Sequence, residues 1–446
     1  MINIHSVARW NRSRLSSLFF ENTKKNSEFN EQRAFQFFFG NIVPKKEFEL
    51  TEDLIETYKK YTVVQPGDIM INGLNLNYDF VTQRVGLVKN NGIMTSAYLS
   101  LRARSSDINN RYYCYLLKTV DAQKMFHGLG TGIRLTLSFD DIKNFRIPVP
   151  PRDEQDQIVR FLDWKVSTVN KLINAKRQEI KSLVELKRSM VCSIVTRGLS
   201  QNVPMKYSGV KWLGDIPAHW EIVPLCAIAK EKSICGCVDL PLLSVYLDEG
   251  VILFSEKEEK RTNVTSKDLS KYQRVDPGDF VLNNQQAWRG SVGVSNHTGI
   301  VSPAYIVASL DDTLNITYAN YLLRSRKMVD QYLVISRGVG SIQRNIYWTS
   351  LKRVVVPVPP KEEQKMIVSN LEESDRKLSE AADRLMREIE TLEEYKTKLI
   401  ADVVTGKIDV RGFEIPEYEF VEEVGSDEVD ENSDNTDEQE DLLCHF

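Results

Sequence analysis

The stretches "IPVPPRDEQDQIV" (residues 147–159) and "VPVPPKEEQKMIV" (residues 356–368) are nearly identical and lie 209 residues apart. Each runs from β-branched residues to a Pro-Pro pair, and then to acidic residues, a glutamine and an apolar periodic segment. Proline pushes the residue before it into extended geometry and is tolerated in the first turn of a helix, where acidic side chains suit the positive end of the dipole. Each stretch therefore predicts a strand that ends near Pro148 or Pro357 and a helix that begins near Pro151 or Pro360.

The repeat extends along the chain at offsets of 206 to 211 residues. The matching pairs are "ARW" (8–10) with "AHW" (218–220), "PGDIMIN" (66–72) with "PGDFVLN" (277–283), "NGIMTSAY" (91–98) with "TGIVSPAY" (298–305), and "YCYLLKT" (113–119) with "ANYLLRS" (319–325). The segments between these anchors differ strongly, as "GLNLNYDFVTQR" (73–84) and "NQQAWRGS" (284–291) show. The chain is therefore an internal duplication in which a shared framework carries diverged inserts.

Each half ends in a long segment whose apolar residues alternate at steps of three and four. Such alternation over about five heptads is typical of a coiled coil. An amphipathic helix lying on its own domain would give the same pattern, but a helix of roughly 60 Å outreaches a domain of ~150 residues. We therefore expect the two helices to pair with each other, antiparallel, with Lys187 and Lys396 at equivalent positions that fix the register. The predicted seam consists of Leu162, Val169, Ile173, Ile180, Leu183, Met190, Leu371, Leu378, Leu385, Leu392 and Leu399.

These segments predict an α+β fold with a pseudo-twofold internal repeat. Two similar mixed α/β domains occupy residues 1–150 and 199–359. The first long helix occupies residues 151–198 and the second residues 360–406, and an acidic tail follows at residues 407–446.

Composition is that of an ordinary globular protein, with 42% hydrophobic and 27% charged residues among 446. The sequence has no apolar run of the ~20 residues that a membrane span needs and no signal-peptide pattern, so we expect a cytoplasmic protein. The six cysteines are scattered and predict reduced thiols, and neither they nor the five histidines suggest a metal site. From Gly412 onward the chain has fourteen acidic and no basic residues, which leaves a net charge of +10 on residues 1–411. We interpret the tail as a solvated, disordered extension, with shielding of the basic body as the alternative.

No catalytic motif is present. The sequence has no P-loop, no Gly-x-Ser-x-Gly elbow, no HExxH and no EF-hand loop. "HGLGTGIR" (127–134) lacks the strand-glycine-helix setting of a dinucleotide site, and the Asn/Asp-Pro-Pro-aromatic motif of adenine methyltransferases is missing. The chain therefore predicts a protein without catalytic residues, metal or cofactor of its own.

The diverged inserts combine amides, aromatic residues and arginines, which is the chemistry that reads base edges. A solvated polar loop is the alternative interpretation for each residue taken singly. The base-reading candidates are Asn75, Asn77, Tyr78, Arg84, Arg134, Asn283, Gln285, Gln286, Trp288, Arg289, Gln343 and Arg344. The phosphate-contacting candidates are Arg102, Arg104, Lys124, Arg324 and Lys327.

The chain resembles the specificity (S) subunit of type I restriction-modification systems over residues 10 to about 410. The resemblance rests on "KYSGVKWLGDIPAHWEIVPL" (206–225), on "PGDFVLNNQQAWRGSVGVS" (277–295) with "GIVSPAYIV" (299–307), on both "PVPP" joints, and on the helix endings "SIVTRGL" (193–199) and "DVVTGKIDVRG" (402–412). The first half lacks an equivalent of "SGVKWLGDIP", and the acidic tail lies outside the family pattern.

The resemblance implies a non-catalytic subunit with two target-recognition domains, each reading half of a bipartite DNA site. The long helices would set the spacing and dock two methyltransferase (modification) subunits, and restriction subunits with translocase activity would join the complex. Adenine-N6 methylation, S-adenosylmethionine, ATP and magnesium would then belong to the partners. Two alternatives remain, namely a protein-interaction scaffold that does not read DNA and a stand-alone restriction enzyme, which the missing motifs disfavour.

Overall fold

The protein consists of two compact units, each of which contains one α/β head and part of both long helices. The structure, a computed structural model, describes residues 10–38, 40–46, 50–77, 83–130, 135–200, 202–247, 249–256, 268–339 and 343–423. Unit 1 comprises residues 1–178 and 384–446, and unit 2 comprises residues 179–383. We call residues 10–150 head 1 and residues 202–359 head 2. Because the units alternate along the chain, each helix contributes a segment to both.

The two heads have the same sheet topology. Head 1 has a four-stranded sheet in the order β2 (Phe19–Glu21), β9 (Leu99–Ala103), β6 (Ile69–Ile71), β7 (Val85–Leu87). Head 2 has the same sheet in the order β14 (Ala229–Glu231), β21 (Tyr305–Leu310), β18 (Asp279–Asn283), β19 (Val292–Val294). All of these neighbours pair antiparallel, so the duplication predicted from the sequence is present strand by strand.

Three two-stranded pairs in each head also correspond. In head 1 they are β1 (Asn11–Arg14) with β10 (Arg146–Val149), β3 (Phe35–Phe38) with β4 (Asn41–Pro44), and β5 (Thr62–Val64) with β8 (Gly92–Met94). In head 2 they are β13 (Glu221–Pro224) with β24 (Val355–Val358), β15 (Leu243–Tyr246) with β16 (Gly250–Leu253), and β17 (Gln273–Val275) with β20 (Gly299–Val301). Head 2 has two further hairpins, β11 (Met205–Tyr207) with β12 (Asp215–Pro217), and β22 (Arg337–Val339) with β23 (Gln343–Asn345).

Short helices complete each head. Head 1 has α1 (Leu15–Leu18), α2 (Glu52–Lys59), α3 (Asn110–Ala122) and α4 (Phe139–Ile142). Head 2 has α6 (Ile316–Leu323), α7 (Arg326–Ile335) and α8 (Trp348–Leu351). In each head a helix packs against the end strand of the four-stranded sheet, α3 against β7 and α6 against β19. The matched "YCYLLKT" lies in α3, and "ANYLLRS" begins in α6.

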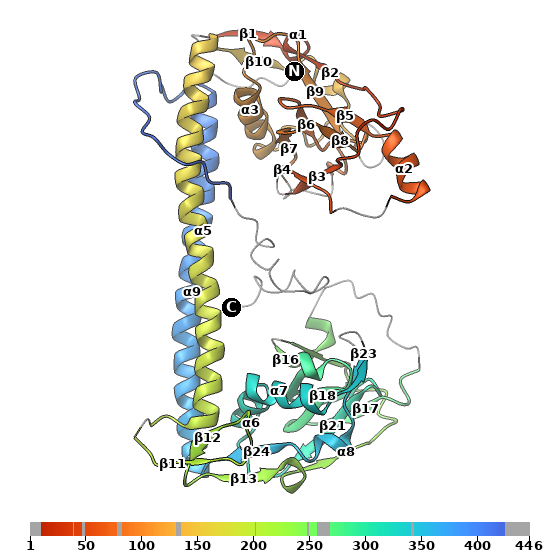
Figure 1. Ribbon diagram of the computed structural model, residues 1–446, viewed down its shortest axis with the longest axis vertical. Coiled ribbons are helices and arrows are strands. Elements are labelled where there is room, and N and C mark those ends of the chain that lie inside the picture. The colour runs from red at the N-terminus through yellow and green to blue at the C-terminus, as the bar shows by residue number, and fades with distance from the viewer. Residues whose placement is uncertain are drawn as a thin grey trace. The chain divides into compact units, whose positions relative to one another are not determined.

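The long helices are α5 (Arg152–Arg197) and α9 (Lys361–Val404), and in each unit a segment of one lies antiparallel to a segment of the other (Figure 1). In unit 1, Lys176 pairs with Glu388, and Arg177 pairs with Glu393 at 3.1 Å. In unit 2, Lys187 pairs with Asp375 at 2.5 Å. Within unit 1, Leu162 shares a core with Val403, whereas Lys176, further along α5, pairs with Glu388, earlier in α9. Within unit 2, Lys187 pairs with Asp375, and Val195 shares a core with Leu371, so each segment is antiparallel. Of the predicted seam residues, Leu162, Val169, Ile173, Ile180, Leu371, Leu385 and Leu399 are buried, and Leu183, Met190, Leu378 and Leu392 are half-buried.

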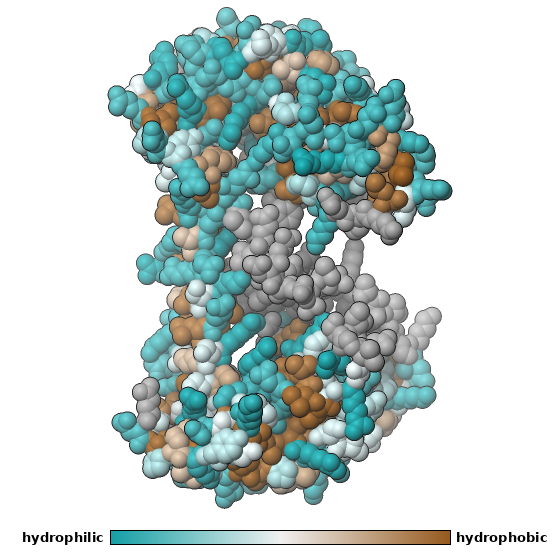
Figure 2. Space-filling model, viewed as in Figure 1, coloured by the Kyte–Doolittle hydropathy of each residue, from teal (hydrophilic) through white to brown (hydrophobic). Residues whose placement is uncertain are grey.

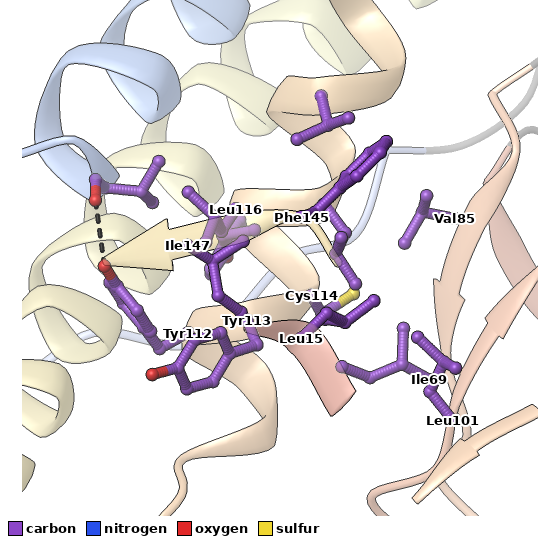
Figure 3. Packing of buried hydrophobic residues seen from close by; sticks show 14 of the residues in the cluster. Leu15, Ile69, Val85, Leu101, Tyr112, Tyr113, Cys114, Leu116, Phe145 and Ile147 are labelled. Atoms are coloured by element: carbon purple, nitrogen blue, oxygen red, sulfur yellow. Dashed lines mark hydrogen bonds between the residues drawn. The ribbon is translucent and has the colours of Figure 1, made fainter. Parts of the chain in front are cut away.

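Each head closes its core with the start of one long helix and the end of the other. The core of head 1 includes Phe161 and Leu162 of α5 together with Val403 and Val404 of α9. The hydroxyl of Tyr112 donates to the carbonyl oxygen of Val404 at 2.9 Å (Figure 3). In head 2 the hydroxyl of Tyr318 donates in the same way to the carbonyl oxygen of Val195, at the end of α5, at 3.1 Å.

The repeated Pro-Pro joints have a structural explanation. Gln155 is buried; its carboxamide accepts from the backbone N–H of Asn109 at 2.9 Å and donates to the carbonyl oxygen of Pro150. Gln364 accepts from the N–H of Asn315 at 2.7 Å and donates to the carbonyl oxygens of Thr313 and Pro359. A buried amide satisfied in this way fixes the angle between head and helix.

The tryptophans of "ARW" and "AHW" anchor the entry of each head to the same joint. The indole N–H of Trp10 donates to Glu154 at 3.0 Å, and that of Trp220 donates to Glu363 at 3.1 Å. The glutamate directly before each joint glutamine is therefore a hydrogen-bond acceptor, in addition to its place in the first helical turn.

The structure corrects the interpretation of the tail for residues 407–423, which we call the strap. Val410 is 2% exposed within the core of head 1, and Phe413 packs edge-on against Phe161 with ring centroids 5.2 Å apart. Side chains on α5 bind the strap's backbone: Ser167 donates to the carbonyl oxygen of Glu419, and Asn170 to that of Val421. Apolar residues interleaved with the acids hold the strap on the helix, so this part is not a solvated extension. The remaining tail, residues 424–446, lies outside the described residues.

Candidate nucleic-acid interface

The insert between β18 and β19 of head 2 forms a tight, polar loop. Asn283 ends β18, and its side chain accepts from the backbone N–H of Gln285 at 3.1 Å. Gln285 and Gln286 are exposed, while Ala287 is fully buried and anchors the short 3₁₀ turn Ala287–Arg289. The loop therefore presents its amides outward from a fixed base.

The hairpin β22–β23 is joined to this loop through the backbone. The N–H of Ile346, directly after β23, donates to the carbonyl oxygen of Asn284 at 2.9 Å. The N–H of Asn284 in turn donates to the carbonyl oxygen of Ala304. The β18–β19 loop and the hairpin β22–β23, about sixty residues apart in sequence, thus lie next to each other in head 2.

At this junction Trp288 is flanked by two arginines. The guanidinium carbon of Arg289 lies 4.8 Å from the ring centroid of Trp288, and that of Arg344 lies 5.7 Å from it. The indole N–H of Trp288 donates to the carbonyl oxygen of Gln285 at 2.8 Å, which fixes the plane of the ring. The structure therefore brings together three of the base-reading candidates predicted for head 2. Gln343 lies in β23, and its side chain is outside the described part of the chain.

The candidates of head 1 have different outcomes. Asn75 is exposed and adopts a positive φ of 55°, and Asn77 is half-buried next to it. Tyr78 and Arg134 lie outside the described residues. The prediction for Arg84 is wrong in this structure, because the residue is 0% exposed and its guanidinium donates to the carbonyl oxygens of Asn72 and Leu74. Through these hydrogen bonds Arg84 stabilises the backbone conformation at the start of the insert.

Two of the predicted phosphate contacts in head 1 have internal partners. Arg102 forms a two-pronged ion pair with Asp68 at 2.7 and 2.8 Å, and the hydrogen bond to Asp68 raises the pKa of the Arg102 guanidinium. Arg104 is exposed; it donates to the carbonyl oxygen of Ser16 and lies 5.5 Å from the ring of Phe20. Arg102 therefore stabilises head 1 through its ion pair, a structural role in place of the predicted phosphate contact. Arg104 remains exposed at the surface.

Asp68 belongs to the repeated Pro-Gly-Asp turn, and its counterpart Asp279 is also paired with a cation. Lys232 donates to both Asp276 and Asp279 at 2.6 Å. Burial lowers the pKa of Lys232, but the hydrogen bonds to the two aspartates outweigh it, so the net shift is upward. The aspartate of the turn is thus paired with a cation in each head, which comes from Arg102 of β9 in head 1 and from Lys232, directly after β14, in head 2.

The remaining phosphate candidates are half-buried. Arg324 donates to the carbonyl oxygen of Leu247 at 3.3 Å, and Lys327 donates to that of Leu213 at 2.7 Å. Burial lowers the pKa of Lys327. Both side chains connect α6 or α7 to neighbouring loops of head 2, which is a structural role. Lys124 lies just after α3 with a positive φ of 56°.

Two exposed residues in or directly after the hairpin β22–β23 region were not among the base-reading candidates predicted from the sequence. Tyr347 is 53% exposed directly after Ile346, and Arg337 is exposed opposite Asn345 in the hairpin. Tyr347 lies in the "GVGSIQRNIYW" stretch (338–348), where an aromatic residue three positions after Arg344 was the available signal.

No cluster of three or more His, Cys, Asp or Glu residues suited to a metal ion occurs among the described residues. Nor does any helix in the described ranges have the length and apolar character to cross a membrane. Figure 2 shows a mostly hydrophilic surface over unit 1 in this view.

Comparison with known proteins gives concordant matches. Residues 9–182 and 244–391 match the profile of the type I restriction modification DNA specificity domain. The putative type I restriction enzyme MjaX specificity subunit of Methanocaldococcus jannaschii is 26% identical over 320 residues, which cover 70% of this chain and 71% of that protein. The type I restriction enzyme MjaVIII specificity subunit of the same organism is 24% identical over 384 residues, which cover 81% and 84%.

A solved structure has the same fold. It is described as showing complex assembly and conformational transition of the type I R-M system, and one of its chains superimposes with a TM-score of 0.61. The match covers 90% of this chain and 99% of that chain at 15% identity, so it concerns the fold alone.

Proposed function

Because this chain belongs to the family of type I restriction-modification DNA specificity domains, we propose that it is the specificity subunit of such a system and reads DNA without catalysing a reaction. One observation carries the proposal. The two heads have the same strand order and the same joints, but they differ in the loops that carry amides, aromatic residues and arginines. A shared frame with different loops is what two recognition modules for two different half-sites require.

The duplication also supports a bipartite site and two partner subunits. One chain that presents two similar faces can bind two copies of one subunit around a pseudo-twofold axis. We take those copies to be methyltransferase (modification) subunits that dock on α5 and α9. Restriction subunits would join this complex, and adenine methylation, S-adenosylmethionine, ATP and magnesium would belong to the partners. The complex would act on DNA in the cytoplasm.

The paired helices supply a spacer between the half-sites. α5 has 46 residues, and at a rise of ~1.5 Å per residue it is about 70 Å long. The buried seam and the ion pairs stiffen the pair, so its length would fix the number of unread base pairs between the two half-sites.

The test is a methylation map. The chain is combined with the modification subunits encoded next to it, the complex acts on a DNA library, and methylated bases are located by single-molecule sequencing. The proposal expects one bipartite motif with a gap of constant length. Methylation without sequence preference would remove it. A parallel titration of DNA affinity against salt separates a DNA reader from a protein scaffold, because phosphate contacts make log affinity fall steeply with log salt.

A further inference from the structure

The junction of the two loops in head 2 is built around one aromatic ring. Trp288 comes from the β18–β19 insert and Arg344 from the hairpin β22–β23, and their side chains meet at 5.7 Å from guanidinium carbon to ring centroid. Arg289 approaches the same ring at 4.8 Å. An indole attracts a cation placed over its face, and arginine also stacks on it through its planar group. The ring therefore orients two guanidinium groups that the sequence places in separate segments.

Arg344 is also held by a hydrogen bond. One of its terminal nitrogens donates to the hydroxyl oxygen of Ser336 at 3.2 Å, and that hydroxyl donates to the carbonyl oxygen of Leu333 at 2.6 Å. Ser336 lies directly after α7, so the hydrogen bonds tie the guanidinium to a helix end. Gly338, the residue opposite Arg344 in the hairpin, carries no side chain.

Stacking and edge-on hydrogen bonding use different parts of a guanidinium. The stack occupies the flat face, while the five N–H donors point outward in the plane of the group. A planar fork of donors matches the O6 and N7 acceptors of guanine in the major groove, which is the commonest specific contact between a side chain and a base. A side chain that is already oriented loses less rotamer freedom when it makes that contact.

We propose that Arg344 reads a guanine in the half-site of head 2 and that Trp288 is a positioning residue that holds Arg344 in plane for this contact. The inference rests on the proposed function and adds to it the recognised base and the two residues that select this base. Trp288 belongs to the insert that differs between the heads, and "GLNLNYDFVTQR" (73–84) of head 1 has no tryptophan. A tryptophan present in one insert alone, with a guanidinium aligned on it, favours a contact that is specific to the half-site of that head.

The experiment uses the reconstituted complex of the full chain with its modification subunits and a library in which every half-site position is randomised. The readout is the ratio of methylation rates for guanine against the other bases at each position. Four variants are compared with the unaltered chain: Arg344→Ala, Trp288→Leu, Trp288→Phe and the double variant Arg344→Ala with Trp288→Leu. Arg326→Ala is the matched control, because Arg326 is an exposed arginine of α7 in the same head, paired with Asp330.

We expect Arg344→Ala to lower the preference for guanine at one position of one half-site by about 5- to 150-fold, the factor expected for one bidentate base contact. Trp288→Leu should lower the same preference although Arg344 is still present, and Trp288→Phe should restore it because a ring is kept. The double variant should be no worse at that position than Arg344→Ala alone, because both changes act through one contact. Arg326→Ala should leave every preference unchanged.

Three outcomes would overturn the inference while leaving the proposed function standing. In the first, Arg344→Ala slows methylation of all sequences by one factor, as a phosphate contact would. In the second, Arg344→Ala leaves all base preferences intact. In the third, Trp288→Leu leaves the preference for guanine intact, which would remove the positioning role. By contrast, a complex of the unaltered chain that shows no preference at any position would refute the proposed function itself.

Discussion

Loss of the acidic partner should destabilise the protein more at Lys396 of α9 than at Lys187, the equivalent lysine of α5. In unit 1, the side chain of Lys396 is 13% exposed and pairs with Glu423 of the strap, which is 27% exposed. In unit 2, Lys187 and Asp375 are 36% and 38% exposed. The residue at the position of unit 1 that corresponds to Asp375 is Val166, so α5 supplies no acid there and the strap supplies it instead.

The magnitude follows from these exposures. Glu423→Gln leaves a mostly buried ammonium without its carboxylate, which costs about 1–3 kcal/mol, whereas loss of an exposed pair costs ~0.2–1 kcal/mol. Opening of the strap and of the adjoining α5 segment should therefore become easier by roughly 5- to 150-fold in Glu423→Gln. Asp375→Asn should change local opening in unit 2 by less than about 5-fold.

The contribution of Glu423 also depends on pH. Burial raises the pKa of Glu423, but attraction by Lys396 and Arg177 and their hydrogen bonds outweigh it, so the pKa lies below its ordinary value. A carboxyl with a lowered folded-state pKa stabilises the protein above its unfolded pKa of ~4.3 and loses that effect as pH falls through the folded value. The difference between the unaltered chain and Glu423→Gln should therefore be full near neutral pH and shrink in acid.

The assay is amide hydrogen exchange of the full chain. It is read on peptides from residues 160–178 and 407–423 for Glu423→Gln and from residues 179–197 for Asp375→Asn, with peptides of head 2 as internal reference. The double variant Lys396→Met with Glu423→Gln should exchange more slowly than Glu423→Gln alone, because the unpaired buried charge has been removed. Equal effects of Glu423→Gln and Asp375→Asn, or no recovery in the double variant, would refute the reasoning.

Three further predictions follow from the same contacts. The first inserts one heptad after Ser182 of α5 and one after Glu380 of α9, two positions that face each other by the register of the ion pairs. The insertions keep the seam and lengthen the spacer by ~10 Å, so the methylation map should show a gap about three base pairs longer. An unchanged gap would contradict the spacer role. Gln364→Ala should destabilise unit 2 by about 1–3 kcal/mol in chemical unfolding because it removes the partner of three backbone groups, of which the carbonyl oxygen of Pro359 is bonded in a buried position. A change under ~0.5 kcal/mol would show that the joint does not depend on the amide. Asp68→Asn should destabilise head 1 by about 1–3 kcal/mol through the uncompensated Arg102, whereas Glu56→Gln, at an exposed pair, should be neutral within ~0.5 kcal/mol in the same measurement.

The duplication and the paired helices could be predicted because their signals repeat. Pro-Pro joints and heptads are local patterns with a fixed physical meaning, and their recurrence at offsets of 206 to 211 residues, together with the other matched stretches, identified both heads. The pairing of α5 with α9 then follows from the need to bury two apolar seams of similar length.

Individual arginines could not be assigned from the sequence in the same way. Arg84 and Arg102 lie in polar stretches that resemble exposed loops. Arg84 is nevertheless buried and bonded to the backbone of its own insert, and Arg102 pairs with Asp68, 34 residues away. Whether a loop arginine points inward depends on carbonyl and carboxylate groups that only the tertiary fold brings near it. The meeting of Trp288 with Arg344 is a contact of the same long-range kind.

The strap was missed for a related reason. Its acidic composition predicts solvation, yet Val410, Phe413 and Ile415 recur among the acids and pack on the core of head 1. Net charge outweighed a short apolar pattern in the prediction, whereas in the structure α5 offers amide and hydroxyl groups that bind the strap's backbone.

The most direct test of bipartite recognition is a pair of methylation maps, one for the reconstituted complex of the unaltered chain and one for a chain whose residues 283–291 are replaced by the corresponding insert of another family member. The account predicts a two-part motif with a fixed gap, in which the replacement changes one part and leaves the other part and the gap as they were. A motif that changes in both parts, or methylation that follows no motif at all, would contradict it.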